Sequence, residues 1–240
     1  MLASSLERMN DLPSDALVLD VGGWAKPLPR ADWVIDLLPY ETRGAYGTLS
    51  GGVERFSAAT WVERDICDRE PWPFEDGQFD FAVCSHTLED IRDPVGVCAE
   101  LQRVARAGYI EVPSRAAEQS PRVGGGCVGW SHHRWLVDIH EGRVDFVHKP
   151  HVLHARPEYQ LPEGFGGSLP PEQRVQPLWW DGSLECRERV FVGAGSEREF
   201  LLEPVAAYRP ETARARAASG RLRRVATGLG RLLGSRRGRS

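Results

Sequence analysis

Three carboxylates follow short apolar runs in the first third of the chain, and two glycines come after the first of them. Asp20 precedes Gly22 and Gly23, Asp36 lies near the end of the second run, and Asp65 near the end of the third. A carboxylate at such a position can accept hydrogen bonds from both hydroxyls of a ribose, and glycine lets a ligand approach the backbone N–H groups because it has no Cβ. Each acid alone is also explained as a strand-end cap or a turn residue, but their succession favours a nucleotide-like ligand.

Histidines offer a second kind of chemistry. Six of the seven lie between Trp130 and His154, and the seventh is His86. An imidazole with its ordinary pKa of about 6.5 can take a proton from a reacting hydroxyl, so His133 and His86 are the candidate catalytic residues. The structural alternatives are that His133 packs beside Trp135 and that His86 is a buried, hydrogen-bonded histidine.

A metal site is a weaker interpretation of these histidines. The segment has no HxxxH pattern, and the five cysteines of the chain are scattered without a CxxC pair. We therefore predict no metal. The minor alternative is a site that combines His132 or His133 with His151 or His154.

The apolar runs predict the elements that would position these residues. Near-continuous apolar segments that alternate with loops or helices are typical of a parallel sheet covered on both faces. The pattern also predicts a helix with Asp93 as its N-cap, Pro94 in its first turn and Gly108 at its end. The predicted strands are residues 16–21, 31–37, 59–66, 79–86 and 109–113.

The carboxyl ends of parallel strands meet at one edge of an open α/β sheet, and ligands bind outside that edge. In this arrangement Asp20, Asp36 and Asp65 lie there, together with Ser85 and His86 after the fourth strand. We therefore expect these five residues to line one site.

Longer stretches of the sequence resemble the class I S-adenosylmethionine-dependent methyltransferases, and among these the small-molecule type. The resembling stretches are VLDVGG, VIDL, RDICDREPWPFEDGQFDFAVCSHTLEDIRDP and ELQRVARAGYIEVP, which together extend from Val18 to Pro113. The resemblance implies a Rossmann-like, doubly wound α/β fold with a seven-stranded, mostly parallel sheet. It also implies S-adenosylmethionine as the cofactor.

The resemblance assigns cofactor contacts to single residues. They are Asp20, Gly22 and Gly23 for the methionine end, Asp36 for the ribose, Asp65 and Ile66 for the adenine, and Ser85 and His86 for the side near the methyl group. The glycine loop departs from the family pattern, because Trp24 and Lys26 stand where glycines are usual. This departure leaves the path of the loop open.

The histidine-rich segment predicts a β-hairpin added to the main sheet. Apolar and polar residues alternate on either side of a two-residue turn at residues 141–142. The register pairs Trp135 with His148 and Asp138 with Asp145. We expect the face that carries Trp135 to be apolar and the face that carries the two aspartates to be solvated.

Three further segments have weaker patterns. Residues 114–129 are rich in Gly, Ser and Pro, which predicts a mobile loop or lid. Residues 155–173 predict a second irregular stretch that could form another wall of the site. Residues 184–195 predict a late strand that completes the sheet by antiparallel addition.

The composition indicates an ordinary globular chain with a basic end. Hydrophobic residues make up 41% of the 240 residues and charged residues 27%, whereas residues 209–240 hold ten arginines and one acid. We predict one domain over residues 1–208 and a disordered or weakly helical basic tail over residues 209–240. Weak contact of this tail with an anionic membrane surface is an alternative, and we expect no nucleic-acid partner.

The predicted compartment is the cytoplasm. We find no apolar run of transmembrane length and no secretory signal, and the unpaired cysteines are typical of a reducing environment. The favoured function is O-methylation of a hydroxyl on a sugar, glycan or secondary metabolite. N-methylation of a small amine is the enzymatic alternative, and a catalytically silent, cofactor-binding partner subunit is the alternative from another class. The sequence names neither the acceptor nor the oligomeric state.

Overall fold

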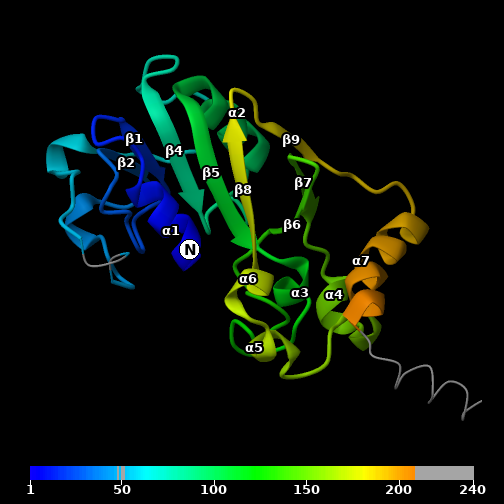
Figure 1. Ribbon diagram of the computed structural model, residues 1–240. Coiled ribbons are helices and arrows are strands. Elements are labelled where there is room, and N and C mark those ends of the chain that lie inside the picture. The colour runs from blue at the N-terminus through cyan, green and yellow to red at the C-terminus, as the bar shows by residue number, and fades with distance from the viewer. Residues whose placement is uncertain (48, 50–51, 209–240) are drawn as a thin grey trace, which may run out of the picture.

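Six strands form the main sheet of the computed structural model, which describes residues 1–47, 49 and 52–208 (Figure 1). Their order across the sheet is β3-β2-β1-β4-β5-β8, with the first five parallel and β8 antiparallel to β5. The order reverses between β1 and β4, which is the switch point at which open α/β sheets bind ligands. The strands are β1 (Val18–Val21), β2 (Trp33–Asp36), β3 (Trp61–Glu63), β4 (Phe79–Ser85), β5 (Ala105–Pro113) and β8 (Val175–Asp181).

The predicted α/β class and the mostly parallel sheet are confirmed, but the predicted count of seven strands is not. Within the described part of the chain, the connections after β1 and β2 are loops with only short 3₁₀ turns, η1 (Tyr40–Thr42) and η2 (Ala58–Thr60). The strands β1, β2 and β3 are therefore connected by fewer helices than a doubly wound fold usually has.

Both faces of the main sheet are buried, which explains the unbroken apolar runs of its strands. One face packs against α2 (Pro94–Val104), and the other against α1 (Ala3–Asn10). Neighbouring residues of one strand serve opposite faces: Leu19 packs in the cluster with α2, and Val18 in the cluster with Met9 of α1. Both side chains are fully buried, and each such burial contributes about 1.5–3 kcal/mol.

The helix α2 begins as predicted and ends earlier. The side chain of Asp93 caps it by accepting a hydrogen bond from Gly96 N at 2.9 Å. The predicted end at Gly108 is wrong, because β5 begins directly after the helix and Gly108 lies inside that strand. A Cβ on Gly108 would come within 2.5 Å of Ala82 O and 2.6 Å of the Trp180 ring, so glycine there serves close packing rather than helix termination.

The strand that closes the main sheet is β8, whereas residues 184–195 were expected to do so. Instead β9 (Glu185–Glu188) pairs in parallel with the hairpin strand β7 (Arg143–His148) in a second, three-stranded sheet. Proline within a segment argues against a strand, and Pro177 lies inside β8. It is tolerated because β8 is an edge strand, where a missing N–H costs no ladder hydrogen bond.

The predicted hairpin is confirmed, including its register. β6 (Trp135–His140) and β7 pair antiparallel in the expected alignment. The turn residues Glu141 and Gly142 have φ of 50° and 82°, which is the left-handed pair that a two-residue hairpin turn needs.

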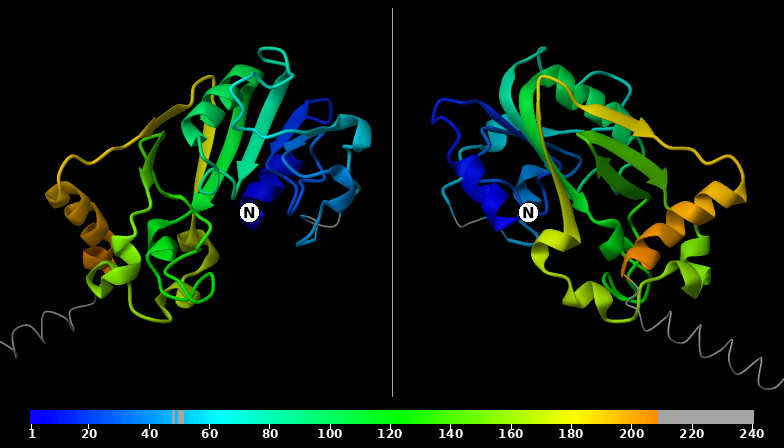
Figure 2. Two further views of the ribbon diagram at one scale, coloured as in Figure 1. Left: turned by 180° about the vertical axis from the view of Figure 1, so that it is seen from behind. Right: turned by 45° about the vertical axis from the view of Figure 1, so that its right-hand side comes forward.

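The prediction that the aspartate face of the hairpin is solvated is wrong. Asp138 and Asp145 are 7% and 3% exposed. The reason is that α7 (Ala194–Tyr208) and α4 (Val152–Ala155) pack over this face, at the end of the molecule far from α1 (Figure 2). Arg115 makes the buried position tolerable for Asp138, because its Nη1 lies 2.8 Å from Asp138 Oδ2.

The first part of the predicted mobile lid, residues 114–129, is a packed element instead. All four residues of α3 (Arg115–Glu118) are buried. The side-chain amide of Gln119 donates to Tyr159 O and Leu201 O, both at 2.8 Å, so tertiary hydrogen bonds hold this segment in place. The second irregular stretch contains the short helices η3 (Pro157–Tyr159), α5 (Phe165–Ser168) and α6 (Pro171–Arg174).

One side chain joins the two sheets. Gln176 of β8 accepts a hydrogen bond from Ile139 N at 3.1 Å and donates one to Val137 O at 2.8 Å. Among the described residues, no helix is long and apolar enough to cross a membrane. The basic tail predicted for residues 209–240 lies outside the described residues.

Candidate active site

Two adjoining cavities lie at the carboxyl ends of the parallel strands. Their volumes are about 450 Å³ and 320 Å³, which is the size range of small-molecule sites. They share the lining residues Gly22, Ala25, Tyr46, His86 and Asp90. The larger cavity also reaches Asp20, Gly23, Ser85, His132 and His133, and the smaller one Asp36, Asp65 and Ile66. The structure therefore brings the predicted cofactor residues and His133 to one place.

The two glycines after β1 are required by the backbone path. Gly22 has a φ of +75°, and its N–H donates to Ile35 O at 2.9 Å. A Cβ on Gly23 would come within 2.3 Å of Asp20 Oδ2, which itself accepts a hydrogen bond from Leu28 N at 2.8 Å. The turn thus folds back closely on the carboxylate. Burial raises the pKa of Asp20 to about 7, against the opposing effect of the Leu28 hydrogen bond.

Asp36 explains the path of the unusual glycine loop. Its Oδ2 accepts a hydrogen bond from Trp24 N at 3.0 Å, and its Oδ1 accepts one from Leu38 N at 2.9 Å. Burial raises the pKa of this carboxyl in spite of those bonds. One carboxylate therefore holds the loops after both β1 and β2, and each oxygen keeps one lone pair for a ligand.

Asp65 is already paired in the second cavity. Its Oδ2 lies against Nη1 of Arg92, and its Oδ1 accepts a hydrogen bond from Cys67 N at 2.9 Å. Partial burial would raise the pKa of Asp65, but the Arg92 guanidinium outweighs it and holds the pKa below its usual value. The neighbouring Ile66 is buried and presents an apolar side chain to the cavity. Sequence reasoning missed Arg92, which only the turn after β4 brings back to Asp65.

His86 is held as a cation between two carboxylates. Its Nε2 lies 3.1 Å from Glu111 Oε1, and its Nδ1 lies 3.4 Å from Glu89 Oε1. Burial alone would lower the pKa of His86, but the two carboxylates raise it to about 9. An imidazolium has no lone pair with which to accept a proton, so this geometry argues against His86 as a general base. Ser85 lines the larger cavity beside it.

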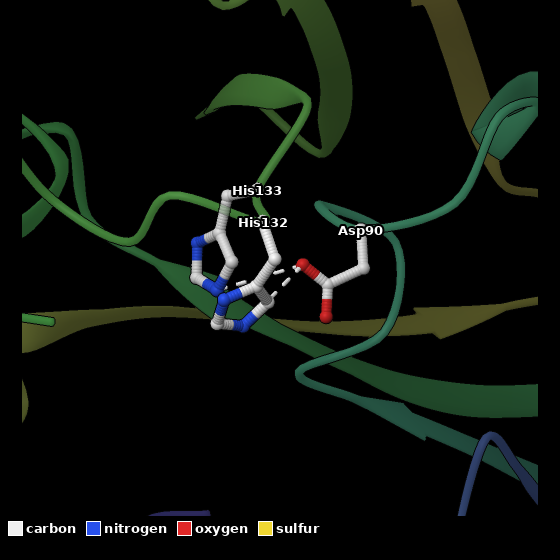
Figure 3. Close-up of side chains that lie close together, drawn as sticks. All are labelled: Asp90, His132 and His133. Atoms are coloured by element: carbon white, nitrogen blue, oxygen red, sulfur yellow. Dashed lines mark ion pairs between the residues drawn. The ribbon is translucent and has the colours of Figure 1, made fainter.

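His133 is fixed from one side and open on the other. Its Nδ1 is hydrogen-bonded to Glu118 Oε1, and Lys149 Nζ holds the other oxygen of Glu118 at 2.7 Å. Trp130, and not the expected Trp135, stacks on the imidazole with a centroid distance of 4.9 Å and an interplanar angle of 19°. These contacts turn His133 Nε2 towards Asp90, whose Oδ1 is 3.6 Å away (Figure 3).

Glu118, Lys149 and Asp90 were not found by sequence reasoning. Glu118 lies in the segment predicted to be a mobile loop, and Lys149 follows the hairpin, so no local pattern joins them. The predicted alternative that pairs His132 or His133 with His151 or His154 also differs from the structure. Among the described residues, the potential metal ligands that come together are Asp90, His132 and His133.

Part of the chain is similar to known proteins. A family described as "Methyltransferase domain" matches residues 48–110. No curated protein matches the chain. This family match covers β3, β4, α2 and the first part of β5, and it includes the cavity-lining residues Asp65, Ile66, Ser85 and His86.

Several solved structures are similar over part of the chain. One is a complex between the Haloferax volcanii Trm112 methyltransferase activator and a methyltransferase, with 20% identity, a TM-score of 0.35, and coverage of 46% of this chain and 50% of that one. Another is a SAM-dependent methyltransferase from Aquifex aeolicus, with 19% identity, a TM-score of 0.33, and coverage of 47% and 63%. A third, from Mesorhizobium loti, has 14% identity, a TM-score of 0.34, and coverage of 84% and 78%.

The match with the Haloferax structure spans about half the length of that solved chain. The parallel sheet has the switch point between β1 and β4 at which open α/β sheets bind ligands. Residues 48–110, which include β4 beside that switch point, match the methyltransferase domain family.

Proposed function

We propose that the protein transfers a methyl group from S-adenosylmethionine to a hydroxyl of a sugar, glycan or secondary metabolite. One observation carries this proposal: Asp36 and Asp65 line the smaller cavity, and the adjoining larger cavity is lined by Asp20 and by His133, which pairs with Glu118. A cofactor and an acceptor can therefore lie next to each other with an imidazole beside the acceptor.

The residues present fit the cofactor. The backbone of Gly22 and Gly23 leaves no room for side chains and exposes the turn to the larger cavity. In the proposal Asp20, Gly22 and Gly23 hold the methionine end, and the free lone pairs of Asp36 accept the ribose hydroxyls. Asp65, which Arg92 holds in place, and Ile66 contact the adenine in the smaller cavity, and Ser85 and His86 lie on the side near the methyl group.

When bound, the cofactor supplies an electrophilic methyl group on a sulfonium. The protein's part is to bring the acceptor oxygen to that group and to remove its proton. His133 is suited to this task, because Glu118 accepts the hydrogen of Nδ1 and leaves the lone pair of Nε2 facing the cavity. Lys149 and Trp130 keep the ring in that orientation. We propose His133 as the catalytic residue and Glu118 as the residue that positions it.

N-methylation of a small amine is the second candidate, and one observation favours it. Both carboxylate oxygens of the buried Glu89 lack a hydrogen-bond partner, although Oε1 forms a 3.4 Å ion pair with His86. A cationic amine in the larger cavity would satisfy this carboxylate. A silent cofactor-binding subunit is the third candidate.

The deciding experiment measures transfer of a labelled methyl group to panels of hydroxyl and amine acceptors. Transfer to hydroxyl compounds supports the proposal, and transfer confined to amines supports the second candidate. Tight binding of S-adenosylhomocysteine with no transfer to any cell extract would favour the silent subunit.

A further inference from the structure

Three potential metal ligands converge at the wall of the larger cavity. Asp90 comes from the turn after β4, and His132 and His133 come from the segment before β6. Asp90 Oδ1 lies 3.6 Å from His133 Nε2 and 4.0 Å from His132 Nε2, and the ligand atoms of the three residues all lie within 4.8 Å of one another (Figure 3).

The central oxygen of this group is unsatisfied. Asp90 Oδ1 is buried and has no hydrogen-bond partner. It faces His133 Nε2, the nitrogen that carries a lone pair in a neutral ring whose Nδ1–H is donated to Glu118. Two acceptors pointing at each other in a buried place repel unless a cation lies between them.

A proton satisfies this arrangement less well than a metal ion does. A proton on His133 Nε2 would have to bridge 3.6 Å to Asp90, which is longer than an N–H···O hydrogen bond. Two ligands of a zinc-like ion, each about 2.0–2.2 Å from the metal, lie about 3–3.5 Å apart. The observed separations are slightly wider, and the exposed side chain of His132 can rotate to close the larger one.

The surroundings of His133 are those of a metal ligand. Histidines that bind metals usually donate their other N–H to a carboxylate, which fixes the tautomer and raises the basicity of the binding nitrogen. Glu118 accepts that hydrogen here, and Lys149 Nζ, 2.7 Å from its second oxygen, holds it in place. Glu89, whose carboxylate oxygens accept no hydrogen bond from the described residues, lines the same cavity.

We propose that Asp90, His132 and His133 bind one divalent transition-metal ion of the zinc, cobalt or nickel type. Two imidazole nitrogens and one carboxylate oxygen suit ions of this borderline softness. Three protein ligands leave a coordination position open, and in this site it faces the cavity.

The consequence for the reaction rests on the proposed function. An ion in this place takes the position of the proton on His133 Nε2, so His133 becomes a ligand and the ion acidifies the acceptor hydroxyl. The O–H bond breaks and its proton passes to water. The acceptor oxygen forms its bond to the methyl carbon as the S–CH₃ bond breaks, which leaves neutral S-adenosylhomocysteine.

The test begins with binding, which does not depend on activity. Full-length chain freed of metal with a chelator is titrated with Co²⁺, and the ligand-field absorption and the bound stoichiometry are measured. We expect one ion per chain, displaced by Zn²⁺. Asp90→Asn and His132→Ala should each weaken binding by at least about 100-fold. His151→Ala, a control at an exposed histidine outside the group, should bind as the unmodified chain does.

His132 is the decisive position: its side chain is 63% exposed, so we expect His132→Ala to leave the fold intact. Absence of binding, or binding unchanged in both variants, would overturn the metal site. Turnover that persists after chelation would overturn the role of the ion in the reaction. Binding of one ion by a chain that transfers no methyl group would count against the proposed function and leave the site standing.

Discussion

The half of the chain that contains β1 to β5 and the half after β5 bring their polar side chains to the cavities in different ways. In the first half, the polar residues stand at the ends of successive strands, so their order along the chain is also their order around the cavities. In the second half, His133 depends on Glu118 from α3 and Lys149 after β7, which are far apart in sequence. A parallel sheet gathers its strand ends automatically, whereas the covering segments meet only through tertiary packing.

The largest expected effect tests whether the second half carries the chemistry. His133→Asn should lower turnover about 10²–10⁴-fold, because it removes the nitrogen that either takes the acceptor's proton directly or binds the ion proposed above, and should leave the affinity for S-adenosylhomocysteine unchanged. Steady-state kinetics and calorimetric binding measure the two quantities, with His151→Ala as the control. Near-normal turnover of the Asn variant would leave His133 with a packing role only.

In the second half of the chain, Arg115 should contribute to the stability of the fold and not to cofactor binding. Its guanidinium is buried and pairs with Asp138, so Arg115→Ala leaves that buried carboxylate with the exposed His140, at 3.5 Å, as its remaining ion-pair partner among the described residues. We expect the free energy of unfolding to fall by about 3–5 kcal/mol, with unchanged cofactor affinity. Arg122→Ala is the matched control, because the side chains of the Arg122–Glu163 pair are 73% and 68% exposed and such a pair contributes at most about 1 kcal/mol. Equal losses in the two variants, measured by denaturant titration, would refute this assignment.

The buried carboxylate of Asp20, in the first half of the chain, should lower the stability of the folded protein. Because burial raises its folded-state pKa to about 7, above the unfolded value of 3.8, folding is opposed increasingly as the pH rises between these values. Asp20→Asn should therefore stabilise the protein by up to about 4 kcal/mol above pH 7, and by less at pH 5. Cofactor affinity should fall. Thermal unfolding of both chains at pH 5 and pH 8 checks the trend, which a pH-independent difference would contradict.

Asp36 tests the ribose contact. Asp36→Ala removes two lone pairs available to the ribose, and we expect S-adenosylhomocysteine to bind about 100-fold more weakly. The variant also loses the hydrogen bonds from Trp24 and Leu38, so unfolding of the ligand-free chain must be measured in parallel. Glu63→Ala, at the end of β3 and outside both cavities, is the control. Unchanged affinity would remove Asp36 from the site.

The smallest expected effect is a pH dependence from His86 and Glu111. The folded-state pKa of His86 is raised to about 9 from 6.5, so its contribution is fully present below pH 6.5 and is lost as the pH rises towards 9. The pKa of Glu111 is lowered to about 2, because hydrogen bonds from His86 and Tyr109 outweigh its burial, so its contribution is lost as the pH falls below about 4.5. His86→Gln should flatten the alkaline limb of the stability profile. An unchanged limb would mean that His86 is neutral in the folded protein.

The strand ends, the hairpin register and the cap of α2 could be predicted because each depends on neighbours in the sequence. β8 could not be predicted from the sequence. It contains Pro177, and a proline is tolerated there only because the strand lies at the edge of the sheet. The same limit applied to the site. Asp20, Asp36 and Asp65 were predictable as strand-end residues, whereas Glu118 and Arg92 act through partners that only the folded chain supplies. The solvated face predicted for Asp138 failed because α7 comes from the far end of the domain.

The amide of Gln176 has a consequence for the behaviour of the chain in solution. Its oxygen and nitrogen occupy the N–H of Ile139 and the C=O of Val137, two groups at the outer edge of the hairpin sheet. Free backbone groups at such an edge offer a template for a strand from another molecule. The amide of Gln176 makes the two hydrogen bonds that one residue of a neighbouring strand would make. Another strand therefore cannot pair with β6 at that point. A single glutamine thereby joins two sheets and also blocks edge-to-edge pairing with another chain at this point of the hairpin sheet.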